Sequence, residues 1–214
     1  MKIIKHIFAA IALMAAIVVI LVWIEHAVSK PNMTGFHPQE MGRLEAGMWR
    51  NYYEKRWLRL TRLTMEGACG QFGYSWWDAS WMALQSGKAA LFFREETDDP
   101  RCQPELEQYF AIVRKSTVQD FDIRKAASLE LGWWRARRQG MAPNDYARII
   151  AQQASLLYGL PEMAFLPACL IRTEAMAYLE SRPNGKMTES DWQEIARQLN
   201  LAYRGFKEAA VQGQ

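Results

Sequence analysis

Three glutamates occupy apolar stretches of this chain at spacings that suit chemistry inside a helical protein. Glu45 and Glu130 each open the pattern Glu-x-Gly-x-Trp-Arg, at 45–50 and 130–135. At 100° per residue, both carboxylates fall in the middle of an apolar helix face, and we expect Glu174 to do the same. Because an isolated buried carboxylate is poorly solvated, each of the three needs a charged partner, hydrogen bonds or a raised pKa.

Aromatic and basic side chains near these glutamates are suited to satisfy them. An aromatic residue stands four positions after each glutamate, and buried Trp N–H and Tyr O–H groups need acceptors. Arg137 is expected on the Glu130 face, and Arg56 and Arg59 on the Glu45 face. The sequence therefore predicts a polar core site in which a network of glutamate, arginine and aromatic side chains holds the fold together. Its expected members are Glu45, Trp49, Tyr52, Glu130, Trp134, Arg137, Glu174 and Tyr178.

Two functional alternatives use the same carboxylates. Glu45, Glu130 and Glu174 would together form an all-oxygen site for a hard cation such as Ca²⁺, Mg²⁺ or Mn²⁺. Two glutamates with separated pKa values would instead act as general acid and base, as in a hydrolase.

The composition excludes several other function classes. All three histidines lie within the first 37 residues, so the rest of the chain has no imidazole for a Ser-His-Asp triad or an HExxH zinc site. No Gly-rich phosphate loop, nucleophile elbow or haem-attachment motif is present, and no cofactor is predicted. The formal net charge is +3, of which Lys2, Lys5, Lys30 and Glu25 carry +2. Residues 31–214 are thus nearly neutral, and no nucleic-acid partner is expected.

The N-terminal segment is expected to anchor the protein in a lipid bilayer. Residues 7–24 are 18 consecutive apolar residues. At about 1.5 Å per residue they span roughly 27 Å, close to the thickness of the hydrocarbon core. A cleaved signal peptide is the rival interpretation, but this run is longer than usual and contains Trp23 near its end. We predict an uncleaved single-pass anchor over 1–30. Lys2 and Lys5 favour a cytoplasmic N-terminus and hence a folded domain on the extracytoplasmic side of the cell membrane.

The rest of the chain predicts a single compact all-α bundle of about seven helices. Residues 31–38 carry two prolines and one glycine and are expected to be a linker, followed by an α-helical globular domain over 39–214. Ser75 is expected to cap one helix, with Asp78 completing a capping box. Short loops between helices indicate antiparallel neighbours. The predicted helices are 39–68, 75–94, 104–115, 122–138, 144–158, 161–182 and 190–211, the sixth ending before Pro183.

The cysteines match neither a metal-binding spacing nor a disulfide framework. Cys69, Cys102 and Cys169 are widely spaced and odd in number. Cys169 is interpreted as a small buried hydrophobic residue. A disulfide bond between Cys69 and Cys102 is possible in an oxidising compartment, and the sequence does not decide whether it forms.

Two further clusters have both a structural and a functional interpretation. The adjacent Trp76 and Trp77 are expected to bracket a wide buried face, with one ring left at the surface as a patch for a partner protein, a sugar or the membrane interface. Arg135, Arg137 and Arg138 end a predicted helix, where cations are favoured by the helix dipole. If that end faced the bilayer, the same arginines would bind phosphate or anionic lipid.

The leading functional hypothesis is a membrane-anchored α-helical interaction or scaffold module with an unknown protein partner. The alternative is a membrane-tethered hydrolase-type or hard-cation-binding protein that uses Glu45, Glu130 and Glu174. A third hypothesis is a small-molecule sensor whose pocket is lined by Trp49 and Tyr52 together with Trp134.

Overall fold

A computed structural model describes residues 2–117, 120–182 and 187–212. Over these residues the chain is helical and contains no strand, so the predicted all-α class is confirmed. A short 3₁₀ turn, η1 (Arg114–Ser116), follows the fifth helix. The α-helices are α1 (Lys2–Val28), α2 (Pro38–Tyr53), α3 (Trp57–Phe72), α4 (Trp76–Glu95), α5 (Cys102–Val113), α6 (Ile123–Arg138), α7 (Pro143–Tyr158), α8 (Glu162–Glu180) and α9 (Glu189–Gln212).

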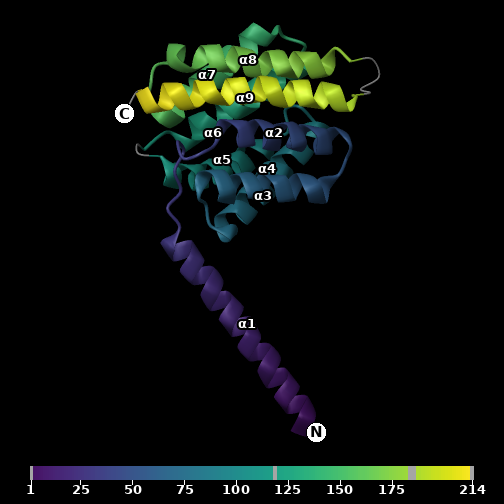
Figure 1. Cartoon of the computed structure of the whole chain (residues 1–214), viewed down its shortest axis with the longest axis vertical. Coiled ribbons are helices and arrows are strands. Elements are labelled where there is room, and N and C mark those ends of the chain that lie inside the picture. Colours follow the sequence, from purple (N-terminus) through teal and green to yellow (C-terminus); the bar gives the residue numbers. More distant parts are fainter. Residues whose placement is uncertain (1, 118–119, 183–186, 213–214) are drawn as a thin grey trace.

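Helix α1 stands apart from the remaining helices, which pack into one compact domain (Figure 1). Its stretch His6–Val28 is long and apolar enough to cross a membrane. Most of its described side chains are exposed, and only Val22, Glu25 and His26 near its end are half-buried. The length and composition of this helix agree with the predicted span.

Helices α2 to α9 form a closed ring of pairwise contacts. Each helix packs against the next one in the sequence, and α9 returns to pack along α2. The closure depends on Gly42, because a Cβ atom at this position would lie 2.6 Å from the backbone nitrogen of Asn200 and 2.9 Å from the carbonyl oxygen of Ala196. No side chain fits between two backbones that close. A glycine in α2 therefore lets the last helix of the domain complete the ring.

The single helix predicted over 39–68 is wrong, because the chain reverses direction between α2 and α3. Lys55 adopts a left-handed backbone conformation with φ 56°. The N–H of Lys55 bonds to the carbonyl of Tyr52, and the N–H of Arg56 bonds to the carbonyl of Asn51 at 2.8 Å. These two bonds form a Schellman motif, which ends a helix and is usually built with glycine at the position of Lys55. No glycine or proline signals the turn in the sequence.

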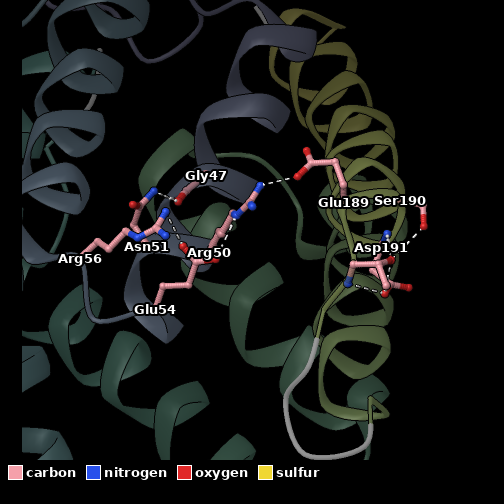
Figure 2. Close-up of polar contacts among 9 residues, drawn as sticks. Gly47, Arg50, Asn51, Glu54, Arg56, Glu189, Ser190 and Asp191 are labelled. Carbon is pink, nitrogen blue, oxygen red and sulfur yellow. Dashed lines mark hydrogen bonds and ion pairs between the residues drawn. The ribbon is translucent and has the colours of Figure 1, made fainter.

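Arg50 ties this turn to the start of α9. Its guanidinium contacts Glu54 at 3.2 Å, the i,i+4 geometry of a surface helix pair, and Glu189 at 2.8 Å. Figure 2 shows Arg50 reaching from α2 toward Glu189 across the gap between the two helices. The last turn of α2 is thus linked to the first turn of α9.

The other six predicted helices are present, with each boundary within two residues of its expected position. Ser75 caps α4 as expected, since its hydroxyl accepts a hydrogen bond from the backbone N–H of Asp78 at 3.0 Å. Asp122 caps α6 in the same way through the N–H of Lys125. Gly159 ends α7 with φ 70°. Pro183, expected to stop α8, lies outside the described residues, and α8 ends at Glu180.

The predicted linker is not a free tether. Phe36 is buried in the core together with Met41 and Leu44, and the backbone N–H of Asn32 bonds to the carbonyl of Phe72 at 2.8 Å. The ammonium of Lys207 donates to the carbonyl of Phe36 at 2.7 Å. These contacts fix the connection between α1 and the domain.

The cysteines are free thiols. Cys169 is fully buried, as expected of a small hydrophobe, and burial raises the pKa of its thiol to about 12. Cys102 is buried and Cys69 half-buried, with no bond between them.

Candidate functional site

Glu45 of α2 is buried, and its partner is an arginine of α8, a helix far from α2 in the sequence. Arg172 of α8 donates two hydrogen bonds to Oε1 of Glu45, at 3.0 Å from Nε and 2.5 Å from Nη2. Burial is the largest single effect on the pKa of Arg172 and lowers it, but the charge and hydrogen bond of Glu45, together with Tyr203 and Glu130, outweigh burial and raise the pKa. The guanidinium also lies 5.5 Å from the centre of the Trp133 ring. The carboxylate is therefore held as an ion pair.

Arg56 and Arg59 were expected to neutralise Glu45, and this is wrong. The reversal of the chain at Lys55 places both arginines in the exposed start of α3, where Arg56 pairs with Glu54 at 2.8 Å. Sequence reasoning missed Arg172, although it lies seven residues after the buried Phe165 and thus on the same face of α8.

Glu130 is half-buried and satisfied by neutral donors. Its Oε1 accepts the indole N–H of Trp134 at 2.9 Å, and its Oε2 accepts the amide of Gln153 at 2.8 Å. The expected contact with Trp134 is thus present, but the expected pairing with Arg137 is not. Glu130 and Arg172 line the same pocket, of about 180 Å³, together with Tyr203. The pKa of the Tyr203 hydroxyl is raised, first by burial and then by the charge of Glu45.

Glu174 does not join the other two glutamates, which corrects the expectation of three buried carboxylates. It is exposed on α8. Helix α8 has apolar residues on most sides, so the period did not single out one buried face. We expected the face that Glu174 shares with Met163 to be buried, but Met163 is itself 70% exposed. The core contains the opposite face, with Phe165, Cys169 and Met176.

The three-carboxylate ligand set is consequently not assembled. Within residues 2–117, 120–182 and 187–212, no group of three or more His, Cys, Asp or Glu side chains is placed to hold a metal ion. The arrangement around Glu45 and Glu130 instead matches the internal network of glutamate, arginine and aromatic residues.

Tyr178 belongs to a separate polar cluster between α8 and α9. Its hydroxyl donates to Asp191 at 2.7 Å, and Arg182 contacts both. The backbone N–H of Thr188 bonds to the same carboxylate and, with the other contacts, lowers the pKa of Asp191. This cluster closes the α8–α9 connection and is distinct from the Glu45 pair.

A surface groove brings together the other candidate residues. It has a volume of about 430 Å³ and lies where the C-terminal halves of α2, α4, α6 and α8 meet. Trp49, Tyr52, Trp134, Arg137 and Arg138, all singled out from the sequence, line it. We call it the aromatic groove, and its complete lining is Trp49, Tyr52, Tyr53, Ala90, Phe93, Trp133, Trp134, Arg137, Arg138, Leu179 and Glu180.

Helices distant in sequence build its walls. Tyr53, Phe93 and Glu180 were not predicted. Tyr53 directly follows the predicted Tyr52, and Phe93 and Glu180 reach the groove only through the packing of α4 and α8. The ring of Phe93 packs edge-on against Trp134 with centroids 5.3 Å apart. Trp133 lines both the groove and the pocket next to Glu130.

The arginines of the groove are held by the protein itself. Arg137 donates to Glu180 at 2.6 Å and to the hydroxyl of Tyr53 at 2.7 Å. Arg138 donates to the carbonyl of Phe93 and stacks over its ring at 4.4 Å. Each guanidinium has five N–H donors, so both keep donors for a further acceptor.

Arg135, the third member of the predicted basic cluster, points elsewhere. It pairs with Asp98 at 2.8 Å. The three arginines therefore do not form one open cationic patch, and only two of them line the groove.

Comparison with protein families, with curated proteins and with solved structures finds no match for this chain. The site is therefore interpreted from its own geometry.

Proposed function

We propose that this protein is a single-pass, membrane-anchored binding module whose aromatic groove receives an extended segment of a partner protein. The observation that carries the proposal is the gathering of six aromatic side chains from three helices around one open groove: Trp49, Tyr52, Tyr53, Phe93, Trp133 and Trp134. Aromatic residues and arginine are the types most enriched where proteins bind one another.

The shape of the groove favours a segment that passes through it over a ligand that is enclosed. Tyr52 and Tyr53 at its edge are 37% and 47% exposed. Proline-rich segments bind aromatic-lined grooves. In the unbound segment the backbone already has the extended polyproline II conformation, and its carbonyls face outward. The N–H donors of Arg137 and Arg138 that their own contacts leave unused suit such carbonyls and support the proposal.

The anchoring part of the proposal rests on α1. Its length suits the hydrocarbon core of a bilayer, and the basic residues before the span favour an extracytoplasmic domain. A phosphatase that is active only outside the cytoplasm, fused after residue 214, tests this orientation. Activity in cells supports it, and an inactive but intact fusion contradicts it.

Selection of displayed random peptides on the full chain in lipid nanodiscs tests the groove. We expect selected peptides to lose at least about tenfold in affinity for Trp49→Ala and Tyr52→Ala, since buried aromatic anchors dominate such interfaces. Trp81→Ala is the matched control, because Trp81 is 39% exposed but lies outside the groove. If the selected peptides bind the groove variants as tightly as the parent, or if no peptide is selected, the proposal is wrong.

A further inference from the structure

The end of α1 docks onto the first turn of α4. The carboxylate of Glu25 accepts the backbone N–H of Trp76 at 3.0 Å, which occupies one of the free N–H groups at the start of the helix. Nδ1 of His26 lies 2.9 Å from the hydroxyl of Ser75 and 3.5 Å from the carboxylate of Asp78. Asp78 is in turn held by Lys115 at 2.7 Å. Two consecutive residues of α1 are thus fixed to the N-terminus of α4.

Exposed tryptophans surround this contact. Trp76 and Trp77 are 61% and 53% exposed, which corrects the expectation that only one of the two rings reaches the surface. Helix α4 buries small residues such as Ala79 and Ala89 on its inner face, so the large rings lie outside. Trp77 packs edge-on against the exposed Trp81 at 6.1 Å. Leu84 continues the same exposed face at 45%.

We infer that Trp76, Trp77 and Trp81, which we call the α4 tryptophan patch, insert into the headgroup layer of the bilayer that α1 crosses. This inference rests on the anchoring role proposed for α1. Tryptophan is enriched at the membrane–water interface because its ring is apolar and its N–H is polar.

The dimensions place the patch at the right depth. The polar layer on each side of the hydrocarbon core is roughly 5–8 Å thick. A span over 7–24 ends one residue before Glu25, whose carboxylate touches the backbone of Trp76. From Trp76 to Trp81 the helix rises only about 7.5 Å. All three rings therefore start within one polar layer of the end of the span, and Trp23, which is 69% exposed on α1, precedes Glu25 by only two residues.

The contact is maintained because the domain cannot swing freely around α1. Besides the contacts of Glu25 and His26, the chain after α1 is pinned by Asn32 and by the buried Phe36. Figure 1 shows α1 leaving the domain on the side where α3 lies, away from α8 and α9. A bilayer around α1 thus covers the patch and leaves α8 and α9 in solvent.

Tryptophan fluorescence of the full chain in vesicles with brominated acyl chains tests this inference. Bromine quenches only rings that enter the bilayer. We expect the quenched signal to fall to less than about half when Trp76, Trp77 and Trp81 are all replaced by phenylalanine, with Trp23 supplying most of the remainder. Trp57→Phe and Trp192→Phe are matched controls, one exposed at the α2–α3 turn and one buried in α9, and should leave the quenched signal unchanged.

The outcomes separate the two proposals. Loss of quenching in Trp23→Phe with an unchanged signal in the triple variant would show an inserted α1 and overturn the inference about the patch. No quenching in the parent would contradict the anchor itself. A dimer in detergent that dissociates in the triple variant, without quenching of the patch, would assign the patch to a second copy and also overturn the inference. Circular dichroism checks that the triple variant keeps the fold. The single variants Trp77→Phe and Trp81→Phe disturb the domain less, and each should remove part of the quenched fluorescence.

Discussion

Arg172 of α8 binds Glu45 of α2 in a buried ion pair, with 2.5 Å between Nη2 and Oε1. The two helices lie on either side of α9, so the pair adds a polar link across the closure of the ring. Oε2 of Glu45 has no hydrogen-bond partner among the described residues. Arg172 is therefore the charged partner of this carboxylate, and the hydroxyl of Tyr203 lies close enough to interact with it as well.

Removing that guanidinium should destabilise the domain strongly. Arg172→Met leaves a buried carboxylate uncompensated, and we expect the free energy of unfolding to fall by about 3–5 kcal/mol. The double variant Glu45→Gln, Arg172→Met should recover part of the loss. Urea unfolding of the full chain in detergent measures both. Arg197→Met is the control, because Arg197 forms an exposed pair with Glu194 and its loss should change the free energy of unfolding far less. Equal losses for Arg172→Met and Arg197→Met would contradict the role of the buried pair.

Gly42 should be intolerant of any side chain. In Gly42→Ala the new Cβ would meet three backbone atoms of α9 at under 3.0 Å, so α2 and α9 must separate. We expect a loss of about 1–3 kcal/mol in the free energy of unfolding, measured by the same method. Gly87→Ala in α4 is the matched control. Nothing lies within 4 Å of its Cβ, and alanine favours helix, so it should gain up to about 1 kcal/mol. If both variants lose the same free energy of unfolding, the close approach of α2 and α9 is not the reason why position 42 needs glycine.

The sequence predicted helices well where caps and breakers act locally. Ser75, Asp122 and Gly159 mark helix ends through hydrogen bonds within a few residues, and these ends were found. The turn after α2 was missed because Lys55 carries no such signal. Its left-handed conformation is imposed by packing of α3 against α2, which is a tertiary effect.

The candidate site was predictable only in part, for a similar reason. Glu45 and Glu130 lie on clearly two-sided helices, and each has its polar partners inside the domain. Helix α8 has apolar residues on most faces, so the period could not decide whether Glu174 or Arg172 points inward. The pairing of groove residues from four helices depends on ring closure, which no local pattern encodes.

Lys55 gives a direct test of this tertiary effect. A lysine in the left-handed region costs roughly 1 kcal/mol relative to glycine, so Lys55→Gly should raise the free energy of unfolding by about 0.5–1 kcal/mol. Gly73, with φ 73°, occupies the same conformation at the end of α3, and Gly73→Ala should lower it by a similar amount or more. Thermal unfolding of the two variants in parallel measures both changes. A destabilised Lys55→Gly would show that the lysine side chain makes contacts that outweigh the backbone strain.

Tyr74 should make the domain sensitive to alkaline pH. Burial raises the pKa of its hydroxyl from 10.0 to about 12. The hydroxyl bonds to Ser116 at 2.6 Å and donates to the carbonyl of Val113. Because the folded pKa lies above the unfolded value, the stability that this group contributes is complete below pH 10 and is lost as the pH rises through 12. At pH 12 the loss from Tyr74 alone should be about 2 kcal/mol.

Tyr74→Phe isolates this contribution from other titrating groups. At pH 8 the variant should be less stable than the parent, because it lacks the two hydrogen bonds of the hydroxyl. Between pH 10 and 12, Tyr74 ionises in the unfolded parent but stays largely neutral in the folded parent, which favours the unfolded state. The variant lacks this group, so the difference in the free energy of unfolding between the two proteins should shrink by about 2 kcal/mol. Urea unfolding at pH 8, 10, 11 and 12 measures this difference. A constant difference from pH 8 to 12 would mean that the Tyr74 hydroxyl ionises as easily in the folded domain as in the unfolded chain.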